Sequence, residues 1–523
     1  MARRAQPLGR ALPAGLAAAG AMLGLSLGTL AAVAWRAEGA ATLGPADWAA
    51  LRFTLTQALL SAALSVALAV PVARALARRQ FPGRALLIAL LGAPFILPVI
   101  VAVIGLLAVF GRSGLISQAL APLGLGPIDI YGLGGVVLAH VFFNLPLATR
   151  LILQGWLAIP AERFRLAASL CFSARDVARL LEWPMLRSVL PGAFLVIFLI
   201  CTTSFAVALT LGGGPRATTV ELAIYQAFRF EFDLGRAALL SLIQVALCAG
   251  AAALAFAVTV PGGFGAGLDR PLARRDAGGP GLRLLDGLWI GLAALFLLVP
   301  LGMIVARGLA GILDLPPSVW QAAGRSLAVA LGSAALTLIL ALPMALAAVR
   351  LGGAPGAALQ AAGLMTIAAS PLVMGTGLFI LLFPLADPVA LALPLTALVN
   401  AAMSLPFALR ALTPAVAEAE AGFGRLADSM GLRGTARLRL VLLPRLRRPI
   451  GFTLGLAAAL SMGDLGVIAL FADPDRATLP LQLYRLMAAY RMEAAAGAAL
   501  LLLALSLGLF WIFDRGGRIH AQA

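Results

Sequence analysis

The sequence predicts an all-α protein that crosses a membrane about twelve times, and composition, apolar runs and an internal repeat support this. Of the 523 residues, 62% are hydrophobic and 12% are charged, and the mean hydropathy is +1.00. A water-soluble domain of this length does not carry so apolar a composition. The apolar runs are continuous rather than alternating, which favours membrane-spanning helices over a β-barrel.

Twelve apolar runs are long enough to cross a bilayer, since a helix needs about 20 residues to span the hydrocarbon layer. The boundary between the ninth and tenth runs is the least marked. The predicted spans are 11–35, 54–76, 86–110, 132–153, 188–211, 237–260, 284–306, 325–349, 357–383, 388–411, 450–471 and 492–514.

The arginines give these spans an orientation. The chain has no lysine, and with a cytoplasmic N-terminus 28 of its 39 arginines fall in cytoplasmic loops and 11 on the opposite side. The positive-inside rule therefore predicts a multi-pass membrane protein with both termini in the cytoplasm. The net charge of +17 follows from this topology, and with no recognition module beside it we expect lipid contacts and no nucleic-acid partner.

The chain is a tandem duplication. Residues 61–71 match 333–343 at an offset of 272, and further along Leu145-Pro146 matches Leu405-Pro406 at an offset of 260. Six spans per copy is an even number, so the copies enter the membrane in the same direction, related by a pseudo-two-fold axis along the membrane normal. We predict a first unit at 1–261, a cytoplasmic linker rich in Gly, Pro and Arg at 262–281, and a second unit at 282–523.

One loop motif recurs in both copies and predicts a docking helix. Arg165-Leu166-Ala167, Cys171 and Pro184 in the first copy correspond to Arg425-Leu426-Ala427, Gly431 and Pro444 in the second. The motif predicts a short helix across the membrane face, with an apolar side that a partner's groove can hold and a charged rim. Lipid headgroups could also receive such a helix. The apolar side is formed by Leu166, Leu170 and Phe172, with Met430 and Leu432 in the second copy, and the rim by Arg163, Arg165 and Arg175.

Prolines frame the first copy of this motif. We expect Pro160 and Pro184 to break the chain on either side, so that the short helix moves as a unit.

The chain has no ATPase site of its own. A phosphate-binding P-loop requires a lysine, and the sequence contains none. If ATP drives this protein, another polypeptide hydrolyses it. The three cysteines have no metal-site spacing, and we expect neither a cofactor, a metal nor an enzymatic activity.

Polar residues inside apolar spans are candidates for a substrate pathway, because an aspartate at a helix centre costs about 2.5–3.5 kcal/mol on insertion scales. Asp464 lies between Gly463 and Gly466, and Ser204, after Thr203, is its partner in the first copy. Further candidates precede the two Leu-Pro pairs. They are His140, Asn144, Asn400 and Ser404, which could instead bond backbone carbonyls freed by the prolines.

The repeated loop resembles the signature of permease subunits of binding-protein-dependent ABC importers, whose coupling helix docks on the ATPase. Four further segments are similar to fused thiamine permeases of this class, and the similarity covers essentially the whole chain. They are Ala139–Pro146, Leu211–Thr219, Glu221–Gln226 and Gly463–Val467. The family's glutamate is replaced by Arg165 and Arg425, and Cys171 stands at one of its glycines.

The resemblance implies a permease of the bacterial inner membrane that imports thiamine by ATP-driven alternating access, with thiamine phosphates as further candidate substrates. It implies a cytoplasmic ATPase homodimer, held by two coupling helices, and a periplasmic binding protein as partners. A ferric-iron ABC permease is an alternative because such permeases are also fused duplications. An ion-coupled secondary transporter is a second alternative, since it shares the parallel repeat without needing a docking helix.

Overall fold

The computed structural model describes residues 11–37, 43–92, 94, 96–214, 217–258, 279–368, 370–471 and 474–519. Within these ranges every regular element is a helix. Of the predicted linker 262–281, residues 262–278 lie outside the described residues, as do both ends of the chain.

The first copy contains twelve α-helices in the described residues. They are α1 (Ala11–Ala37), α2 (Pro45–Arg78), α3 (Arg84–Leu90), α4 (Val99–Phe110), α5 (Leu115–Leu120), α6 (Leu133–Leu157), α7 (Ala161–Ser169), α8 (Ala174–Val177), α9 (Trp183–Thr202), α10 (Ala206–Leu211), α11 (Val220–Arg229) and α12 (Leu234–Val258).

The second copy repeats most of this order. Its helices are α13 (Pro280–Gly311), α14 (Pro317–Leu351), α15 (Gly353–Leu364), α16 (Pro371–Leu382), α17 (Ala392–Ser429), α18 (Gly434–Arg437), α19 (Leu443–Met462), α20 (Gly466–Phe471), α21 (Leu479–Ala488) and α22 (Met492–Ile519). The offset of 272 separates α4 from α16, and the offset of 260 separates α9 from α19 and α10 from α20. Corresponding helices of the two copies are thus separated by the same two offsets that the sequence repeat shows.

Eleven helices in the described residues are long and apolar enough to span a membrane, and α16 is a shorter apolar helix. This confirms the predicted class. Four predicted runs differ from single helices. Run 86–110 is divided into α3 and α4, and run 188–211 into α9 and α10. In the second copy, run 357–383 is divided into α15 and α16, and run 450–471 into α19 and α20.

Two of these breaks coincide with a proline. Pro98 caps α4, and Ser370 caps α16 with Pro371 as its first residue. A proline lacks the amide proton that would continue the preceding helix, so a new helix starts there.

The first helix of each copy packs on the other copy. Helix α1 lies against α14 and α16, whereas α13 lies against α2 and α4. The approach is close where side chains are small. A Cβ atom on Gly377 of α16 would fall 2.5 Å from the carbonyl oxygen of Thr29 in α1. Small residues allow two membrane helices to pack backbone to backbone, so this pairing interlocks the copies.

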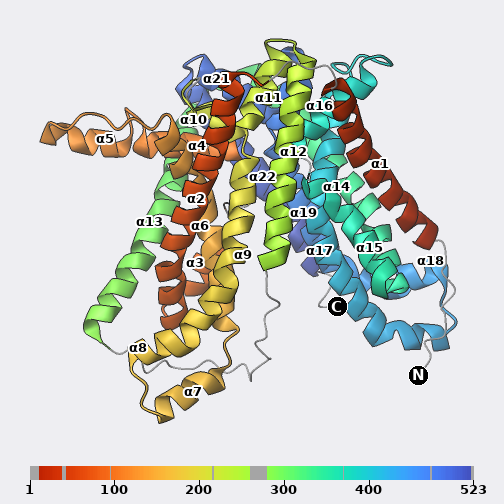
Figure 1. Ribbon diagram of the computed structural model, residues 1–523, viewed down its shortest axis with the longest axis horizontal. Coiled ribbons are helices and arrows are strands. Elements are labelled where there is room, and N and C mark those ends of the chain that lie inside the picture. Colours follow the sequence, from red (N-terminus) through yellow and green to blue (C-terminus); the bar gives the residue numbers. More distant parts are fainter. Residues whose placement is uncertain are drawn as a thin grey trace.

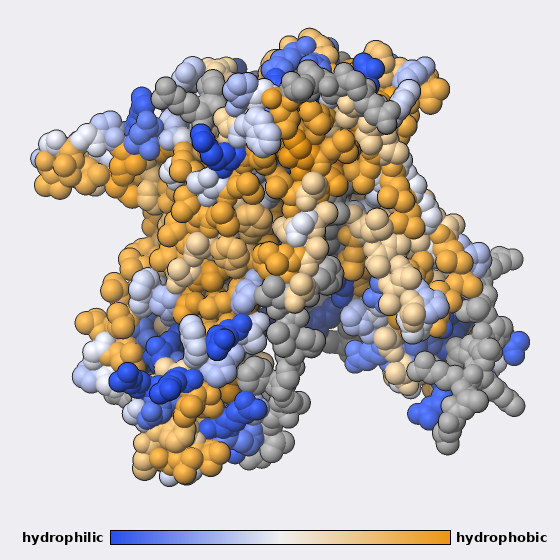
Figure 2. All heavy atoms as spheres, in the orientation of Figure 1, coloured by the Kyte–Doolittle hydropathy of each residue, from blue (hydrophilic) through white to orange (hydrophobic). Residues whose placement is uncertain are grey.

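Several short helices lie at two opposite ends of the molecule. Helices α7 and α8 lie at the same end as α18 and the C-terminal part of α17, whereas α5, α11 and α21 lie at the other end (Figure 1). Figure 2 shows hydrophobic side chains around the middle and hydrophilic ones concentrated toward the ends, notably over α7 and α8. This is the surface expected of a protein surrounded by lipid.

Candidate functional site

Both copies of the loop motif fold into the same turn. In the first, Phe172 N–H donates to the Ala167 carbonyl over 2.9 Å, and in the second Leu432 N–H donates to the Ala427 carbonyl over 2.9 Å. The residue before each donor is left-handed, with φ of 54° at Cys171 and 67° at Gly431. These are Schellman turns, which end a helix by satisfying its last carbonyls. The repeat is therefore preserved in backbone hydrogen bonds.

The turns present apolar side chains to the outside. Four of these side chains are more than half exposed, while Ala167 and Ala427 beside them are buried. The exposed residues are Leu166 at 59%, Leu170 at 58%, Leu426 at 56% and Met430 at 65%. Phe172 and Leu432 are half-buried and support the turns from beneath, while Arg165 and Arg425 are exposed beside the apolar residues. We call these two surfaces the first knob (Leu166 and Leu170) and the second knob (Leu426 and Met430).

The two knobs are carried differently. The first sits on α7, which is separated from α6 by a break at residues 158–160. The second sits on the last turns of α17, a 38-residue helix that continues through Pro414 from the membrane span. Pro160 thus breaks the first copy as predicted, and the second copy has no such break.

Pro184 does not break the chain, contrary to the sequence-based prediction. Residues 174–202 form one continuous helix, in which a π-helical turn (Ala178–Glu182) precedes the proline. The same turn, Leu438–Leu442, precedes Pro444. A π-turn widens the helix by one residue and relieves the clash between a proline ring and the preceding turn. Helix α7 is therefore separated from the following helix by the turn at residues 170–173, and not by Pro184.

After each turn, a buried charged residue forms ion pairs with a helix that precedes the turn in the chain. In the first copy Glu182, after the turn, pairs with Arg74 of α2 over 2.6 Å and lies 3.8 Å from Arg78. In the second copy Arg437 pairs with Glu420 and, over 2.5 Å, with Asp428, both in α17.

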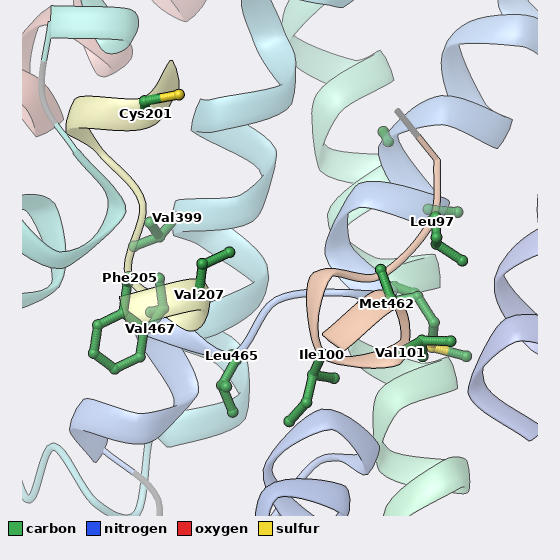
Figure 3. Packing of buried hydrophobic residues seen from close by; sticks show 14 of the residues in the cluster. Leu97, Ile100, Val101, Cys201, Phe205, Val207, Val399, Met462, Leu465 and Val467 are labelled. Atoms are coloured by element: carbon green, nitrogen blue, oxygen red, sulfur yellow. The ribbon is translucent and has the colours of Figure 1, made fainter. Parts of the chain in front are cut away.

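Breaks in the spans of the two copies lie close together in the buried interior. The chain is broken between α9 and α10 at residues 203–205, and between α19 and α20 at residues 463–465. A Cβ on Gly463 would lie 3.1 Å from Pro98 Cα, and one on Gly466 would lie 3.6 Å from Phe205. Figure 3 shows Cys201 and Phe205 on one side, with Met462 beside Leu97 and Val101 on the other. Breaks from both copies are thus brought together.

Asp464 occupies the second of these breaks. Its Oδ1 accepts a hydrogen bond of 3.5 Å from Val467 N–H, whereas its buried Oδ2 has no hydrogen-bond partner among the described residues. Asn400 lies beside it and donates to Ser461 Oγ over 3.0 Å. Asp464, Asn400 and the break therefore form one polar group inside an apolar core.

The counterparts in the first copy are less polar. Ser204 and Thr203 are half-buried in the first break, and the Thr203 hydroxyl donates to the Ile200 carbonyl over 3.2 Å. A backbone bond of this kind caps the end of a helix.

The histidine and asparagine of the first copy lie between helices. His140 Nδ1 is 3.3 Å from Ser61 Oγ of α2, and Asn144 donates to the His140 carbonyl over 2.9 Å. Asn144 also reaches Cys201 Sγ of α9 over 3.4 Å. These contacts link α2, α6 and α9 within one copy. Ser404 is likewise buried in α17.

Sequence reasoning missed three buried polar residues as site candidates, namely Gln57, Glu221 and Gln244. All three are fully buried, and Gln57 donates to the Cys201 carbonyl over 2.9 Å. Their signal was a polar residue in an apolar run, the same signal that identified Asp464.

A lateral groove of about 470 Å³ lies between α2, α6 and α13. Leu64, Leu68, Leu292 and Phe296 are among its lining residues, and Trp289 is the only lining residue whose side chain can hydrogen-bond. Such a lining suits lipid chains rather than a polar solute.

Comparison with known proteins identifies the family. The thiamine transport system permease protein ThiP of Brucella abortus is 40% identical over 533 residues, covering 99% of this chain and 97% of that protein. ThiP of Salmonella typhimurium is 39% identical with full coverage of both, and ThiP of Escherichia coli is 38% identical over 98% of both. The chain belongs to the thiamine transport permease family.

A more distant similarity supports the class. A sulfate transport system permease protein, CysW of Synechocystis, is 26% identical over 201 residues, which is 38% of this chain and 72% of that protein. No protein-family profile matches the chain. The family membership makes the protein a multi-pass permease of the inner membrane and a transport component.

Proposed function

We propose that this chain forms the translocation pathway of an ATP-driven ABC importer that carries thiamine into the bacterial cytoplasm. The observation that carries the proposal is similarity to ThiP proteins from end to end, at 38–40% identity. Both copies of the repeat fall inside these alignments, so the relatives share the fused arrangement. We also propose that thiamine phosphates are candidate substrates.

The partners we propose are a separate ATPase and a periplasmic binding protein. The absence of lysine from the sequence excludes a P-loop, so ATP hydrolysis belongs to another chain. Two exposed apolar knobs at one end of the molecule would suit two copies of one ATPase subunit. One fused chain would then serve one ATPase homodimer.

The same surfaces support an orientation of the protein in the membrane. The two knobs lie in arginine-rich loops at one end of the molecule, and under the positive-inside rule that end would face the cytoplasm. Both termini would then be cytoplasmic, and α11 and α21 would face the binding protein.

For the pathway we propose the central breaks and Asp464. Thiamine carries a positively charged thiazolium ring, and a carboxylate beside the route would lower the cost of moving a cation through an apolar core. Asn400, Ser404, Ser204 and Thr203 would offer neutral hydrogen-bonding groups along the same route. His140 and Asn144, which bond within one copy, would support the helices that line it.

The function is tested by uptake of labelled thiamine in a strain that lacks its own permease. Expression of this chain with its cognate ATPase and binding protein should restore uptake. The double variant Leu166→Asp and Leu426→Asp should abolish uptake because a charge in each knob opposes an apolar groove. Leu125→Asp, at a residue 55% exposed near the opposite end, is the matched control and should transport normally.

The same cells separate the alternatives. Restored uptake of labelled ferric iron in place of thiamine would identify an iron permease. Thiamine uptake that persists without the ATPase, and stops when the proton gradient is dissipated, would identify a secondary transporter and overturn the proposal.

A further inference from the structure

A buried acid in α11 has no role in the function described so far. Glu221, in the first turn of α11, has no solvent exposure. Neither of its carboxyl oxygens has a hydrogen-bond partner in the described residues. A buried carboxylate is normally paired or multiply hydrogen-bonded, because moving a lone charge out of water is costly.

The side chains that face Glu221 come from both copies. They are Gln244 of α12 and Ser370, the residue that caps α16. The Gln244 amide nitrogen donates to the Thr202 carbonyl over 3.0 Å, and in the part of the chain that the structure describes the Gln244 Oε1 has no hydrogen-bond partner. Within the described residues, the Gln244 amide oxygen and both Glu221 carboxyl oxygens lack hydrogen-bond partners, and two acceptors can bond each other only through a proton.

The charged groups around α11 do not neutralise the acid. From α12 the thiol of Cys248 faces Glu221, while α16 and α20 carry no ionisable residue. At this end of α2, Asp47 is tied to Arg236 over 2.7 Å, and Arg52 is exposed. On α11 itself the ionisable residues are Tyr225 and Arg229. Burial raises the pKa of Glu221 to about 8.

We propose that Glu221 is a proton-binding positioning residue, whose protonated carboxyl donates to Gln244 Oε1 and thereby fixes the break after Thr202. The contact chain runs from α11 through Gln244 to the Thr202 carbonyl, where α9 ends. The second copy has Leu481 at the equivalent position, so this device belongs to the first copy alone. The relation of Glu221 to a transport pathway rests on the proposed function. The proposal that Glu221 binds a proton does not depend on that function.

The proton site is tested by the thermal unfolding of the full chain in lipid nanodiscs from pH 5 to 9, for wild type and Glu221→Gln. A group whose folded-state pKa is raised contributes stability that is full below its unfolded pKa and is lost as the pH rises through the folded pKa. The midpoint of Glu221→Gln should therefore exceed that of wild type by a gap that widens up to about pH 8, the folded pKa of Glu221, and then levels. Glu162→Gln, at an exposed acid in α7, is the control and should show no widening gap.

Infrared spectroscopy keeps the test decisive if the variant is poorly folded. At pH 6 the wild-type chain should show a protonated carboxylic acid band that Glu221→Gln lacks and that shifts in Gln244→Leu. A constant gap in the unfolding midpoints, or an unchanged carboxylic acid band in both variants, would overturn the proposal. Neither measurement uses ATPase or substrate, so failure here leaves the transport function untouched.

Thiamine uptake distinguishes hydrogen bonding by the side chain at position 221 from a role that depends only on its size. Glu221→Gln keeps a neutral donor and should transport at a rate close to that of wild type at pH 6–7, whereas Glu221→Leu, of similar size, should transport several-fold more slowly. Equal rates in the two variants would show that hydrogen bonding at this position does not matter.

Discussion

At the scale of single residues, the two turns show how a duplicated sequence can diverge while its backbone does not. The left-handed conformation at Gly431 costs little, but at Cys171 the same conformation brings Cβ close to its own backbone. The sequence could predict the glycine position, because both turns follow one motif. It could not predict that Cys171 would keep the glycine's conformation, because the hydrogen bond of the following residue enforces it.

Cys171→Gly should raise the thermal midpoint or leave it unchanged, because it removes a steric cost of about 1 kcal/mol. Cys171→Val should lower the stability by at least that amount, since a β-branched residue tolerates a left-handed conformation poorly. Differential scanning fluorimetry in detergent measures both. A destabilised glycine variant beside a stable valine variant would contradict the left-handed turn.

For other residues, the sequence could indicate a buried polar side chain but not its contacts. Asp464 could be identified because an acid between two glycines interrupts an apolar run. Glu221 carries the same signal, yet it lies in a short helix outside the long spans, where an acid attracts less attention. Its significance depends on Gln244 and Ser370, which are distant in sequence and meet it only in the fold.

At the scale of elements, the two knobs are equivalent in surface but not in attachment. The first is joined to α6 through the non-helical residues 158–160, whereas the second continues α17 directly and is bound by the Arg437 ion pairs. Apolar periodicity predicted the spans but not the four internal breaks, because a broken span is as apolar as a continuous one. The π-turns before Pro184 and Pro444 were also unpredictable, since a proline normally indicates that a helix starts or ends.

Arg437→Ala should loosen the second knob, because it leaves Glu420 and Asp428 of α17 without this partner at a cost on the order of 1 kcal/mol or more. In reconstituted vesicles the ATP hydrolysed per thiamine imported should rise, since closure of the ATPase would be transmitted less faithfully. Arg433→Ala, at an exposed arginine, is the matched control. An unchanged ratio in both variants would count against the fastening role of Arg437.

At the scale of the whole molecule, the two copies are interlocked by their first helices. The sequence predicted a duplication and its register, but not that α1 packs on α14 and α16 while α13 packs on α2 and α4. Apolar composition does not tell one lipid-facing helix from another, so partner choice among spans is set by small residues such as Gly377.

The interlock predicts that the chain can be divided. Residues 1–261 and 282–523, expressed together as separate polypeptides, should assemble and restore uptake, because each α1 or α13 still finds its groove on the other copy. A tag on one half should co-purify the other. Halves that insert but fail to co-purify would show that the covalent connection, rather than packing, holds the copies together.

The central claim, that a soluble ATPase docks on the repeated turns from the cytoplasmic side, is tested most directly by Cys171. It is exposed, whereas Cys201 and Cys248 are buried, and these are the three cysteines of the chain. A membrane-impermeant maleimide should label Cys171 in inside-out vesicles but not in right-side-out vesicles, and added ATPase should block the labelling. Labelling from the outer face, or labelling that the ATPase does not affect, would contradict the account.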